Sequence, residues 1–371
     1  MDFVWVTIGS LLVLAGTVDL FMTVLYYDEA GPLSTRLYRS LWWSLRRIAA
    51  VAPHRIKYFV LSLGVPVMVL ASVIFWIALQ LLGFAAIYLV GLREGSFRIA
   101  EGLGAGPLEA LYLSSITLAG LGYGDIAPTD GTFQMVTSLQ ALLGYGFLTL
   151  AIAYVVNVYQ VIREMGVLSS DIYHESQRTY EARYILRVHF HNGTTRDLEG
   201  RLKTFYHSMI AHHEGMRHYP FVFYFYSRRG YAALPYRFGL ISKVIAALHW
   251  GLPAGHPVTQ EPWVMALQSA FDSIAYEIQE RFLPAQKTPE PPKAVDSERF
   301  AIDLVRGTSQ DSMVRRFLEL QEFMEALVQK RISHDPDEAY ARYKQWFEFM
   351  SGTELFLQDC RLYLGPRTSD G

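Results

Sequence analysis

Residues 107–128, PLEALYLSSITLAGLGYGDIAP, decide the fold of this chain. The first part, 107–118, predicts a short helix, because a proline and an acidic residue (Glu109) are both favourable in a first helical turn. The second part has glycine at alternate positions, 120, 122 and 124, which an ordinary helix does not favour. Such a backbone can point successive carbonyls to one side. Four copies around an axis would then form rings of oxygens that replace the water shell of an ion.

Two uncharged stretches, 58–90 and 133–162, flank this segment, and a third apolar stretch, 3–27, contains one charge, Asp19. Each is long enough to cross a bilayer of about 30 Å as a helix of roughly 20 residues. Asp19 lies nearer the cytoplasmic end of its stretch. A charge inside a membrane is costly, so the sequence leaves open a helix-packing role and a gating role for Asp19.

The composition also indicates that part of the chain lies in a membrane. The 371 residues are 51% hydrophobic and only 18% charged, which excludes a disordered or wholly soluble chain. Charged residues are concentrated after residue 167, so the first part is predicted to be membrane and the rest soluble. A net charge of −2 excludes a nucleic-acid partner, and the single cysteine, Cys360, excludes a disulfide framework.

The basic residues predict the orientation. The loop between the first two stretches is rich in arginine and lysine, whereas the loop 91–132 is mainly acidic. The positive-inside rule then places the N-terminus outside and everything after residue 162 in the cytoplasm, in a multi-pass protein of the plasma membrane. Residues 33–50 alternate basic and aromatic positions at helical spacing, which predicts a helix in the inner membrane interface. It serves either as an anchor or to transmit a gating movement.

The residues Thr117-Leu-Ala-Gly-Leu-Gly-Tyr-Gly-Asp-Ile-Ala-Pro128 resemble the pore-loop potassium channels of the bacterial type, with one loop per chain. Over about 58–162, the order of span, pore helix, Gly-Tyr-Gly-Asp filter and span is similar to the family's minimal pore module. We therefore expect an all-α polytopic membrane protein of three parts. They are an N-terminal transmembrane and interfacial region (1–57), a pore domain (58–165: outer helix 58–90, pore helix 107–118, filter 120–125, inner helix 133–162) and a mostly helical cytoplasmic domain (166–371).

The resemblance also implies roles for single residues. Backbone carbonyls facing potassium ions would come from Gly120, Leu121, Gly122 and Tyr123, with Gly124 at the outer mouth. Tyr123 would point away from the ions and pack against the pore helices. The filter would be supported by Asp125, Tyr112 and Thr117, with Tyr112 bonding Asp125 in place of the tryptophan that the family often has. Gly144 falls where many members have a gating hinge, although close helix packing explains Gly144 and Gly146 equally well.

A filter built from one loop per chain implies a homotetramer, surrounded by membrane lipid. Gly120 stands where the family usually has a threonine, whose hydroxyl completes the innermost ion site. We expect a potassium channel, with a weakly selective cation channel as the alternative. A rival of another class is a non-conducting, membrane-anchored signalling or scaffold protein.

The part after residue 166 is predicted to be mostly helical, with a proline-rich linker at 283–293 as a possible subdomain boundary. The expected helices are 196–213, 238–248, 259–281, 297–304, 309–331 and 336–362, and the possible strands are 184–191 and 221–226. Neither a Rossmann glycine motif nor a catalytic set is present, so we expect no enzyme and no cofactor besides potassium ions. A ligand or protein partner of this domain is left unidentified.

Two clusters in this part have two interpretations each. The histidines are either ordinary core and surface residues or a metal or proton-sensing site, the first being preferred, so no transition-metal site is predicted; they are His189, His191, His207, His212, His213 and His218. The aromatic residues of 219–226 either pack in a core or form a membrane-surface contact or a ligand pocket. Packing is the preferred interpretation.

Overall fold

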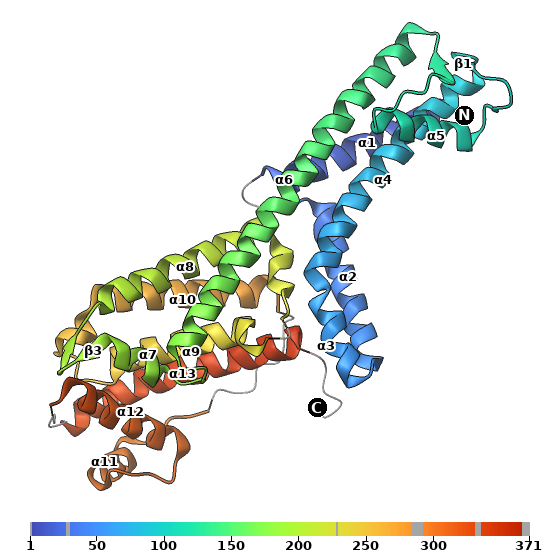
Figure 1. The fold of residues 1–371 in the computed structure, drawn as a ribbon. Helices are drawn as coiled ribbons and strands as arrows, with labels where there is room; N and C mark the ends of the chain where they lie inside the picture. Colours follow the sequence, from blue (N-terminus) through green and yellow to red (C-terminus); the bar gives the residue numbers. More distant parts are fainter. Residues whose placement is uncertain (1, 27–29, 228, 284–291, 331–334, 366–371) are drawn as a thin grey trace. The chain divides into compact units, whose positions relative to one another are not determined.

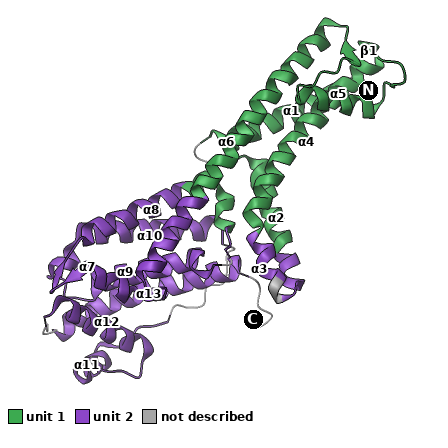
Figure 2. Cartoon of the chain, in the orientation of Figure 1, with its two compact units in different colours: residues 1–45, 63–161, 215–224 green, residues 46–62, 162–214, 225–371 purple. Residues whose placement is uncertain are grey.

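A computed structural model describes residues 2–26, 30–227, 229–283, 292–330 and 335–365. The chain is mainly helical and divides into two compact units (Figures 1 and 2). Unit 1 comprises 1–45, 63–161 and 215–224, and unit 2 comprises 46–62, 162–214 and 225–371.

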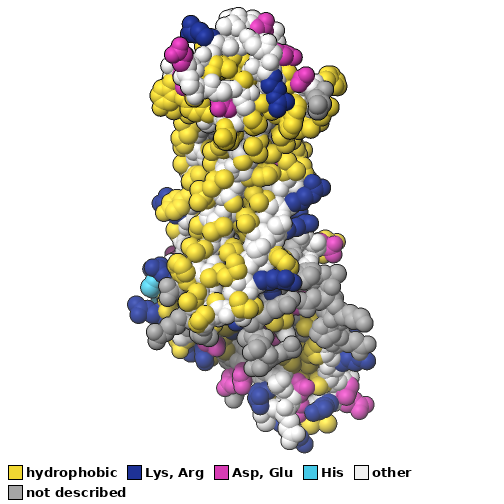
Figure 3. All heavy atoms as spheres, turned by 90° about the vertical axis from the view of Figure 1, so that its right-hand side faces the viewer, with side chains coloured by type: hydrophobic (Ala, Val, Ile, Leu, Met, Phe, Trp, Pro, Cys, Tyr) yellow, Lys and Arg dark blue, Asp and Glu magenta, His cyan; other side chains and the backbone are white. Residues whose placement is uncertain are grey.

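Three helices of unit 1 are long and apolar enough to cross a membrane: α1 (Asp2–Val24), α4 (Gly64–Arg93) and α6 (Gly131–Glu175). They correspond to the three stretches predicted from the sequence. Hydrophobic side chains cover much of the visible surface of these helices (Figure 3). Such a surface is stable in lipid and not in water, so the chain is a membrane protein.

Close contact between glycines joins α1 to α4. A Cβ atom added at Gly9 would lie 2.5 Å from the carbonyl oxygen of Gly83, and one added at Gly83 would lie 2.8 Å from that of Gly9. Small residues let two helices approach this closely, which is a common way of packing them in membranes. The first helix therefore belongs to the same compact unit as α4 and the apolar part of α6, rather than to a separate region 1–57.

The outer helix was predicted to begin at residue 58, and this start is wrong. The uncharged run is divided between α3 (His54–Ser62) and α4, which starts at Gly64. Pro66 explains the break, because proline has no N–H and its ring clashes with the carbonyl four residues earlier. Ahead of it, α2 (Pro32–Val51) is the helix predicted over 33–50.

The inner helix is longer than predicted. The apolar stretch ends at residue 162, where Arg163 and Glu164 follow, but α6 continues to Glu175 because no proline interrupts it. The domain boundary expected between residues 165 and 166 therefore falls inside a continuous helix, which contributes residues to both units.

The helices predicted for the C-terminal part are present, with ends shifted by a few residues, and they lie in unit 2 apart from the last four residues of α8. They are α8 (Leu198–His218), α9 (Leu234–Trp250), α10 (Pro262–Arg281), α11 (Ser297–Arg306), α12 (Ser312–Val328) and α13 (Pro336–Leu364). Short 3-10 helices lie at η2 (Gly230–Ala232) and η3 (Pro257–Gln260). Most of the predicted linker, residues 284–291, lies outside the described residues.

The two predicted strands are wrong. Residues 184–191 are mostly in α7 (Ala182–His189), followed by a two-residue strand, β3 (Phe190–His191), paired with β4 (Thr194–Thr195). Ala182, Ile185 and Leu186 are all buried, and a helix places positions i, i+3 and i+4 on one face. Residues Pro220–Tyr224 form a 3-10 helix, η1.

The aromatic residues of η1 pack in a core, which is the interpretation preferred from the sequence. Phe221, Val222 and Phe223 are buried within unit 1. The ring of Phe221 lies 4.8 Å from that of Tyr38, and Tyr224 stacks on Trp42 at 5.0 Å between centroids. Aromatic pairs at these separations add stability beyond the area they bury. A segment far along the sequence therefore completes the unit that contains the spans.

The core of unit 2 surrounds α9. Its Phe238 lies against Phe271 of α10 and Phe356 of α13, with centroids 5.5 and 6.0 Å apart. A second group of rings joins α11, α12 and α13, where Phe300 stacks on Tyr343 at 4.8 Å. Both clusters include side chains of α13, where aromatic residues recur at helical spacing and so share one buried face.

Candidate functional site

The short helix after Gly106 is α5 (Pro107–Leu118), with the predicted bounds. Its first turn is held by Glu109, whose carboxylate accepts hydrogen bonds from the backbone N–H groups of Gly106 (3.1 Å) and Gly104 (3.3 Å). An acidic side chain at this position also favours the positive end of the helix dipole. The helix therefore starts at a defined residue and aims its C-terminal end at the glycine segment.

The glycine segment has an alternating backbone. Gly120, Gly122 and Gly124 have φ values of +71°, +54° and +80°, whereas Leu121 and Tyr123 keep negative φ. Only glycine adopts positive φ without strain, which explains the residue type at these three positions. At the inner end, the N–H groups of Gly120 and Leu121 donate to carbonyls of α5, those of Thr117 (3.1 Å) and Ile116 (2.8 Å).

The outer end of the segment is anchored by Asp125. The Tyr112 hydroxyl donates to Asp125 Oδ2 at 2.7 Å, and the Ile126 N–H donates to Oδ1 at 3.1 Å. This is the hydrogen bond expected between Tyr112 and Asp125. Strand β2 (Ile126–Pro128) follows at once and pairs antiparallel with β1 (Phe97–Ile99). Sequence reasoning missed this sheet, because strands of three residues have no recognisable period.

A buried chain of polar side chains connects α4, α5 and α6 behind the segment. Tyr88 donates to the Gln140 side chain at 2.6 Å, Gln140 donates to the Ser114 hydroxyl at 2.9 Å, and that hydroxyl donates to the carbonyl of Leu81 at 2.9 Å. Sequence reasoning also missed these residues. The available signal was the isolated Gln140 inside an uncharged span, since polar side chains in membranes are usually paired.

Gly144 lies against the end of α5. A Cβ atom at Gly144 would lie 2.1 Å from the carbonyl oxygen of Leu118, whereas one at Gly146 would meet nothing within 4 Å. The backbones of α5 and α6 therefore approach so closely at Gly144 that no side chain fits. Packing explains this glycine, and the hinge role stays a prediction.

Tyr145 occupies the space beside Gly120. A Cβ atom at Gly120 would lie 2.7 Å from the Tyr145 hydroxyl oxygen. Both residues line a groove of about 350 Å³ between α5, the glycine segment and α6. The missing side chain at Gly120 and the large side chain at Tyr145 therefore fit one another.

Tyr123 and Leu121 have exposed side chains in the single chain, at 67% and 56%, and the expected packing of Tyr123 against the pore helices of a tetramer stays a prediction. The physical reason for the exposure is that α5 lies on one side of the segment, and the single chain has no surface that covers these two side chains. Exposed large apolar side chains of this kind are typical of an interaction surface.

Asp19 joins three helices of unit 1. It is 1% exposed, and its carboxylate accepts hydrogen bonds from the Leu33 N–H (2.8 Å), the Ser34 hydroxyl (2.5 Å) and the Trp76 indole (2.9 Å). Leu33 and Ser34 lie in the first turn of α2, where backbone donors lack helical partners and a negative charge is favourable. The packing role considered for Asp19 is therefore present, and a gating role stays a prediction.

In unit 2, carboxylates of α6 lie among basic side chains. Glu175 contacts His189 at 2.7 Å and also Arg201, which contacts Asp171 at 2.7 Å. Arg237 donates to the carbonyl of Met165 at 3.1 Å. These contacts connect the last turns of α6, which are predicted to lie in the cytoplasm, with α7, α8 and α9.

The histidines do not form one cluster. His213 contacts Glu277 at 2.6 Å, while His212 is buried. Burial, together with nearby Arg237 and His213, lowers the pKa of His212 well below its usual value. Across the part of the chain that the structure describes, no three His, Cys, Asp or Glu side chains are grouped for a metal ion.

Comparisons with known proteins support the interpretation of the span-and-loop region. Residues 69–161 match a protein family described as "Ion channel". The chain is 26% identical over 164 residues to the uncharacterized membrane protein YdjJ of Bacillus subtilis, covering 43% of this chain and 46% of that protein. It is 40% identical over 77 residues to protein LctB of Geobacillus stearothermophilus, covering 19% of this chain and 57% of that protein.

The chain thus spans about half the length of these curated relatives, and no solved structure matches it. The matched region contains most of α4, all of α5, the glycine segment and most of the apolar part of α6. The protein therefore contains an ion channel domain within its membrane unit.

Proposed function

We propose that this protein is a potassium channel that assembles as a homotetramer in the cell membrane. Each chain contributes residues 120–124, and the backbone carbonyls of four chains replace the water around each potassium ion. Conduction is passive, so the protein is not an enzyme and needs no cofactor. The basic residues of the loop between the first two spans put that loop and unit 2 in the cytoplasm and the N-terminus outside.

The observation that carries this proposal is the positive φ at Gly120, Gly122 and Gly124, between α5 and α6 and within the region similar to ion channels. Non-helical backbone at membrane depth is tolerated only where it is buried in protein or lines a water-filled path. The exposed side chains of Leu121 and Tyr123 supply the surface on which neighbouring chains pack in the tetramer.

A weakly selective cation channel is the second candidate, and Gly120 is the observation that favours it. A threonine at this position would require a β-branched residue at a φ of +71° and would collide with Tyr145. The backbone at the innermost ring is therefore incompatible with the residue that is usual in the resembling family. Gly122, Tyr123 and Gly124 match that family, which favours potassium selectivity.

Gating acts through α6 in this proposal. The helix lines the ion path near Tyr145 and continues, without a break, to the ion pairs of Asp171 and Glu175 in unit 2. Between them, the Tyr154 hydroxyl lies 3.2 Å from that of Tyr38 on α2. A movement of the cytoplasmic helices or of α2 is thereby transmitted to the pore, with Gly144 as the expected point of bending.

The test is ion flux through the purified protein in liposomes, with reversal potentials measured in potassium against sodium. Gly124→Asp is the test variant, because it places a side chain and a charge at the outer ring. Gly102→Asp is the matched control, since Gly102 also has positive φ (+89°), has nothing within 4 Å of its Cβ position and lies outside the filter.

We expect a reversal potential near the potassium equilibrium, abolished flux in Gly124→Asp with unchanged assembly, and retained flux in Gly102→Asp. Clear current that reverses near zero would favour the weakly selective channel. Flux that is unchanged in Gly124→Asp would contradict conduction through this segment. If the wild-type protein passes no current, the comparison is repeated in a gate-opened variant, and a continued absence of current would favour the scaffold alternative.

A further inference from the structure

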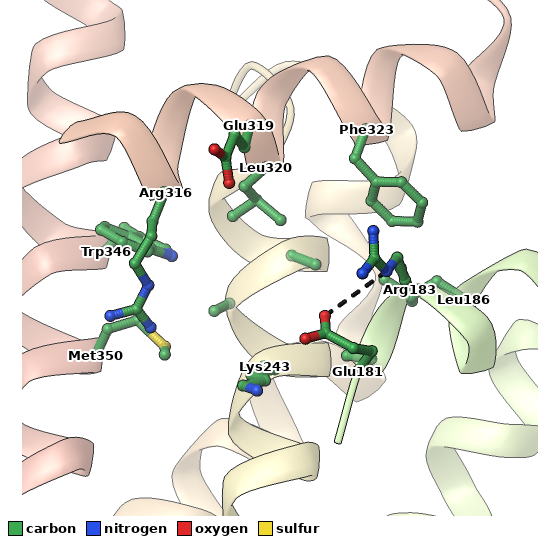
Figure 4. A pocket seen from close by; sticks show the side chains of 13 residues that line it. Glu181, Arg183, Leu186, Lys243, Arg316, Glu319, Leu320, Phe323, Trp346 and Met350 are labelled. Atoms are coloured by element: carbon green, nitrogen blue, oxygen red, sulfur yellow. Dashed lines mark ion pairs between the residues drawn. The ribbon is translucent and has the colours of Figure 1, made fainter. Parts of the chain in front are cut away.

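A pocket within unit 2 has the composition of a ligand site. It has a volume of about 360 Å³ and is lined by α7, α9, α12 and α13 (Figure 4). Small-molecule sites in proteins are clefts of roughly 300–1,000 Å³ with an apolar lining and a few polar groups. This pocket is large enough for a small organic molecule, and all of its lining belongs to one compact unit.

Part of the pocket lining is apolar. It comprises Leu186, Ala246, Ala247, Trp346 and Met350, and all five are buried. Trp346 and Met350 lie together on α13 beside Arg316 of α12 (Figure 4). An indole and a thioether make favourable contacts with an aromatic ring, so Trp346 and Met350 suit an aryl or alkyl group of a ligand.

Five charged side chains also line the pocket, three basic and two acidic. They are Arg183, Lys243, Arg316, Glu181 and Glu319. Arg183 lies 3.7 Å from Glu181, and Arg316 lies 2.7 Å from Glu354, which is outside the lining. Lys243 is therefore the basic side chain of this lining that has no ion pair within the described residues.

Lys243 is partly buried. No carboxylate of the described residues lies within 4.0 Å of its ammonium, which is the limit for an ion pair. Its ammonium donates to the carbonyl of Tyr180 at 2.7 Å and lies 3.9 Å from the centroid of the Tyr180 ring. Burial is the main cause that lowers the pKa of Lys243. Glu181 and Glu354 lie near enough to favour its charged form, but the ammonium has three donors and only the Tyr180 carbonyl accepts from it within the described residues, so an acidic group in the pocket would add a charge-assisted hydrogen bond to Lys243.

We propose that this pocket binds a small organic monoanion, with its carboxylate on Lys243 and its apolar body against Trp346 and Met350. A carboxylate would accept from the donors that Lys243 leaves unused, and the apolar residues of the lining favour a ligand with an apolar body over a fully hydrated ion such as chloride or inorganic phosphate. The proposal does not depend on conduction, since binding is measured whether or not the pore conducts.

The test uses the full-length protein in a nonionic detergent and isothermal titration with 4-phenylbutyrate as the probe. The neutral 4-phenylbutanamide, which has the same apolar body, is the matched control ligand. We expect saturable binding of one probe molecule per chain, and binding of the amide at least about tenfold weaker, because the charge-assisted hydrogen bond is lost.

Two variants change the charge in opposite directions. Lys243→Met weakens binding of the anion by about tenfold or more, and Glu319→Gln strengthens it a few-fold, because a like charge leaves the pocket. Glu319 is exposed, so its variant folds even if the Lys243 variant does not. Lys344→Met and Glu322→Gln are the controls, since both residues are exposed and neither lines the pocket.

The proposal is overturned by three results. They are the absence of saturable binding of 4-phenylbutyrate, equal binding of the anion and the amide, and equal effects of Glu319→Gln and Glu322→Gln. The last two would show that the probe binds through its apolar body alone, including adsorption to the membrane unit or the detergent.

Discussion

Gly144→Ala tests how closely the inner helix packs on the end of the pore helix. The added Cβ atom would lie 2.1 Å from the Leu118 carbonyl oxygen, 3.1 Å from its carbonyl carbon and 3.3 Å from its Cα. All three are backbone atoms, so no rotation of a side chain relieves the collision. Either α5 or α6 must move by about 1 Å, which disturbs the start of the glycine segment.

Overpacking of a well-packed contact costs about 1–3 kcal/mol, and a collision with backbone puts this substitution at the upper end. Gly146→Ala is the matched control, because it lies on the same helix and its Cβ position meets nothing within 4 Å. Replacing a helical glycine by alanine stabilises a helix by roughly 0.5–1 kcal/mol. This gain is common to both variants and cancels in their difference, so they should differ by about 3 kcal/mol in the free energy of unfolding.

The assay is the temperature at which the detergent-solubilised protein loses its folded state, followed by size-exclusion chromatography after heating. We expect a fall of roughly 5–10 °C for Gly144→Ala and no fall for Gly146→Ala. Flux measured on the same samples separates the two roles of Gly144. A hinge would lose flux at an unchanged midpoint, whereas a packing contact lowers the midpoint itself. Equal midpoints for both variants would refute the close-packing argument.

Three further predictions rest on named contacts. Asp19→Asn replaces a carboxylate that accepts several hydrogen bonds, so we expect about 3 kcal/mol lower stability in thermal unfolding, and no change for the exposed Asp2→Asn. Tyr112→Phe removes the 2.7 Å bond to Asp125 and should cost about 1 kcal/mol and reduce potassium flux in liposomes; full flux would show that this bond is dispensable. The pKa of His212 is lower in the folded than in the unfolded state, so the unfolded chain takes up a proton first as the pH falls below about 6.5. Unfolding measured between pH 7 and 5 should therefore lose stability with acid, by up to about 1.4 kcal/mol per pH unit from this residue. His212→Gln should weaken that dependence and the exposed His207→Gln should not; an equal dependence in both variants would contradict the assignment.

Local patterns predicted most of the helices. The first turn of α5 is specified by Pro107 and Glu109, which act within a few residues of sequence, and its bounds agree with the prediction. The buried stripe of α13 likewise follows from helical spacing, with Tyr343, Trp346, Phe347 and Met350 all buried. The errors occurred where a local pattern was ambiguous, as in α7, whose aromatic and β-branched residues resemble a strand although its buried positions follow a helix.

The glycine segment was recognised from the sequence, because positive φ favours glycine at fixed positions and so produces glycine at alternate positions. Its supporting contacts were only partly predicted. The bond from Tyr112 to Asp125 was expected from a family resemblance, whereas the chain from Tyr88 through Gln140 to Ser114 was not. Those three residues are far apart in sequence, and their hydrogen bonds exist only once α4, α5 and α6 pack together.

The sequence by itself determined the spans, the short helix and the alternating glycines, because hydrophobic length, capping and backbone freedom are properties of a residue and its neighbours. Only the tertiary structure decided what Asp19, Gly144 and the aromatic run of η1 contact. It also decided that Lys243 lines a pocket together with a buried indole contributed by another helix. Those facts depend on which distant segments meet, and neither a close approach between backbones nor the lining of a pocket is a property of any single stretch of sequence.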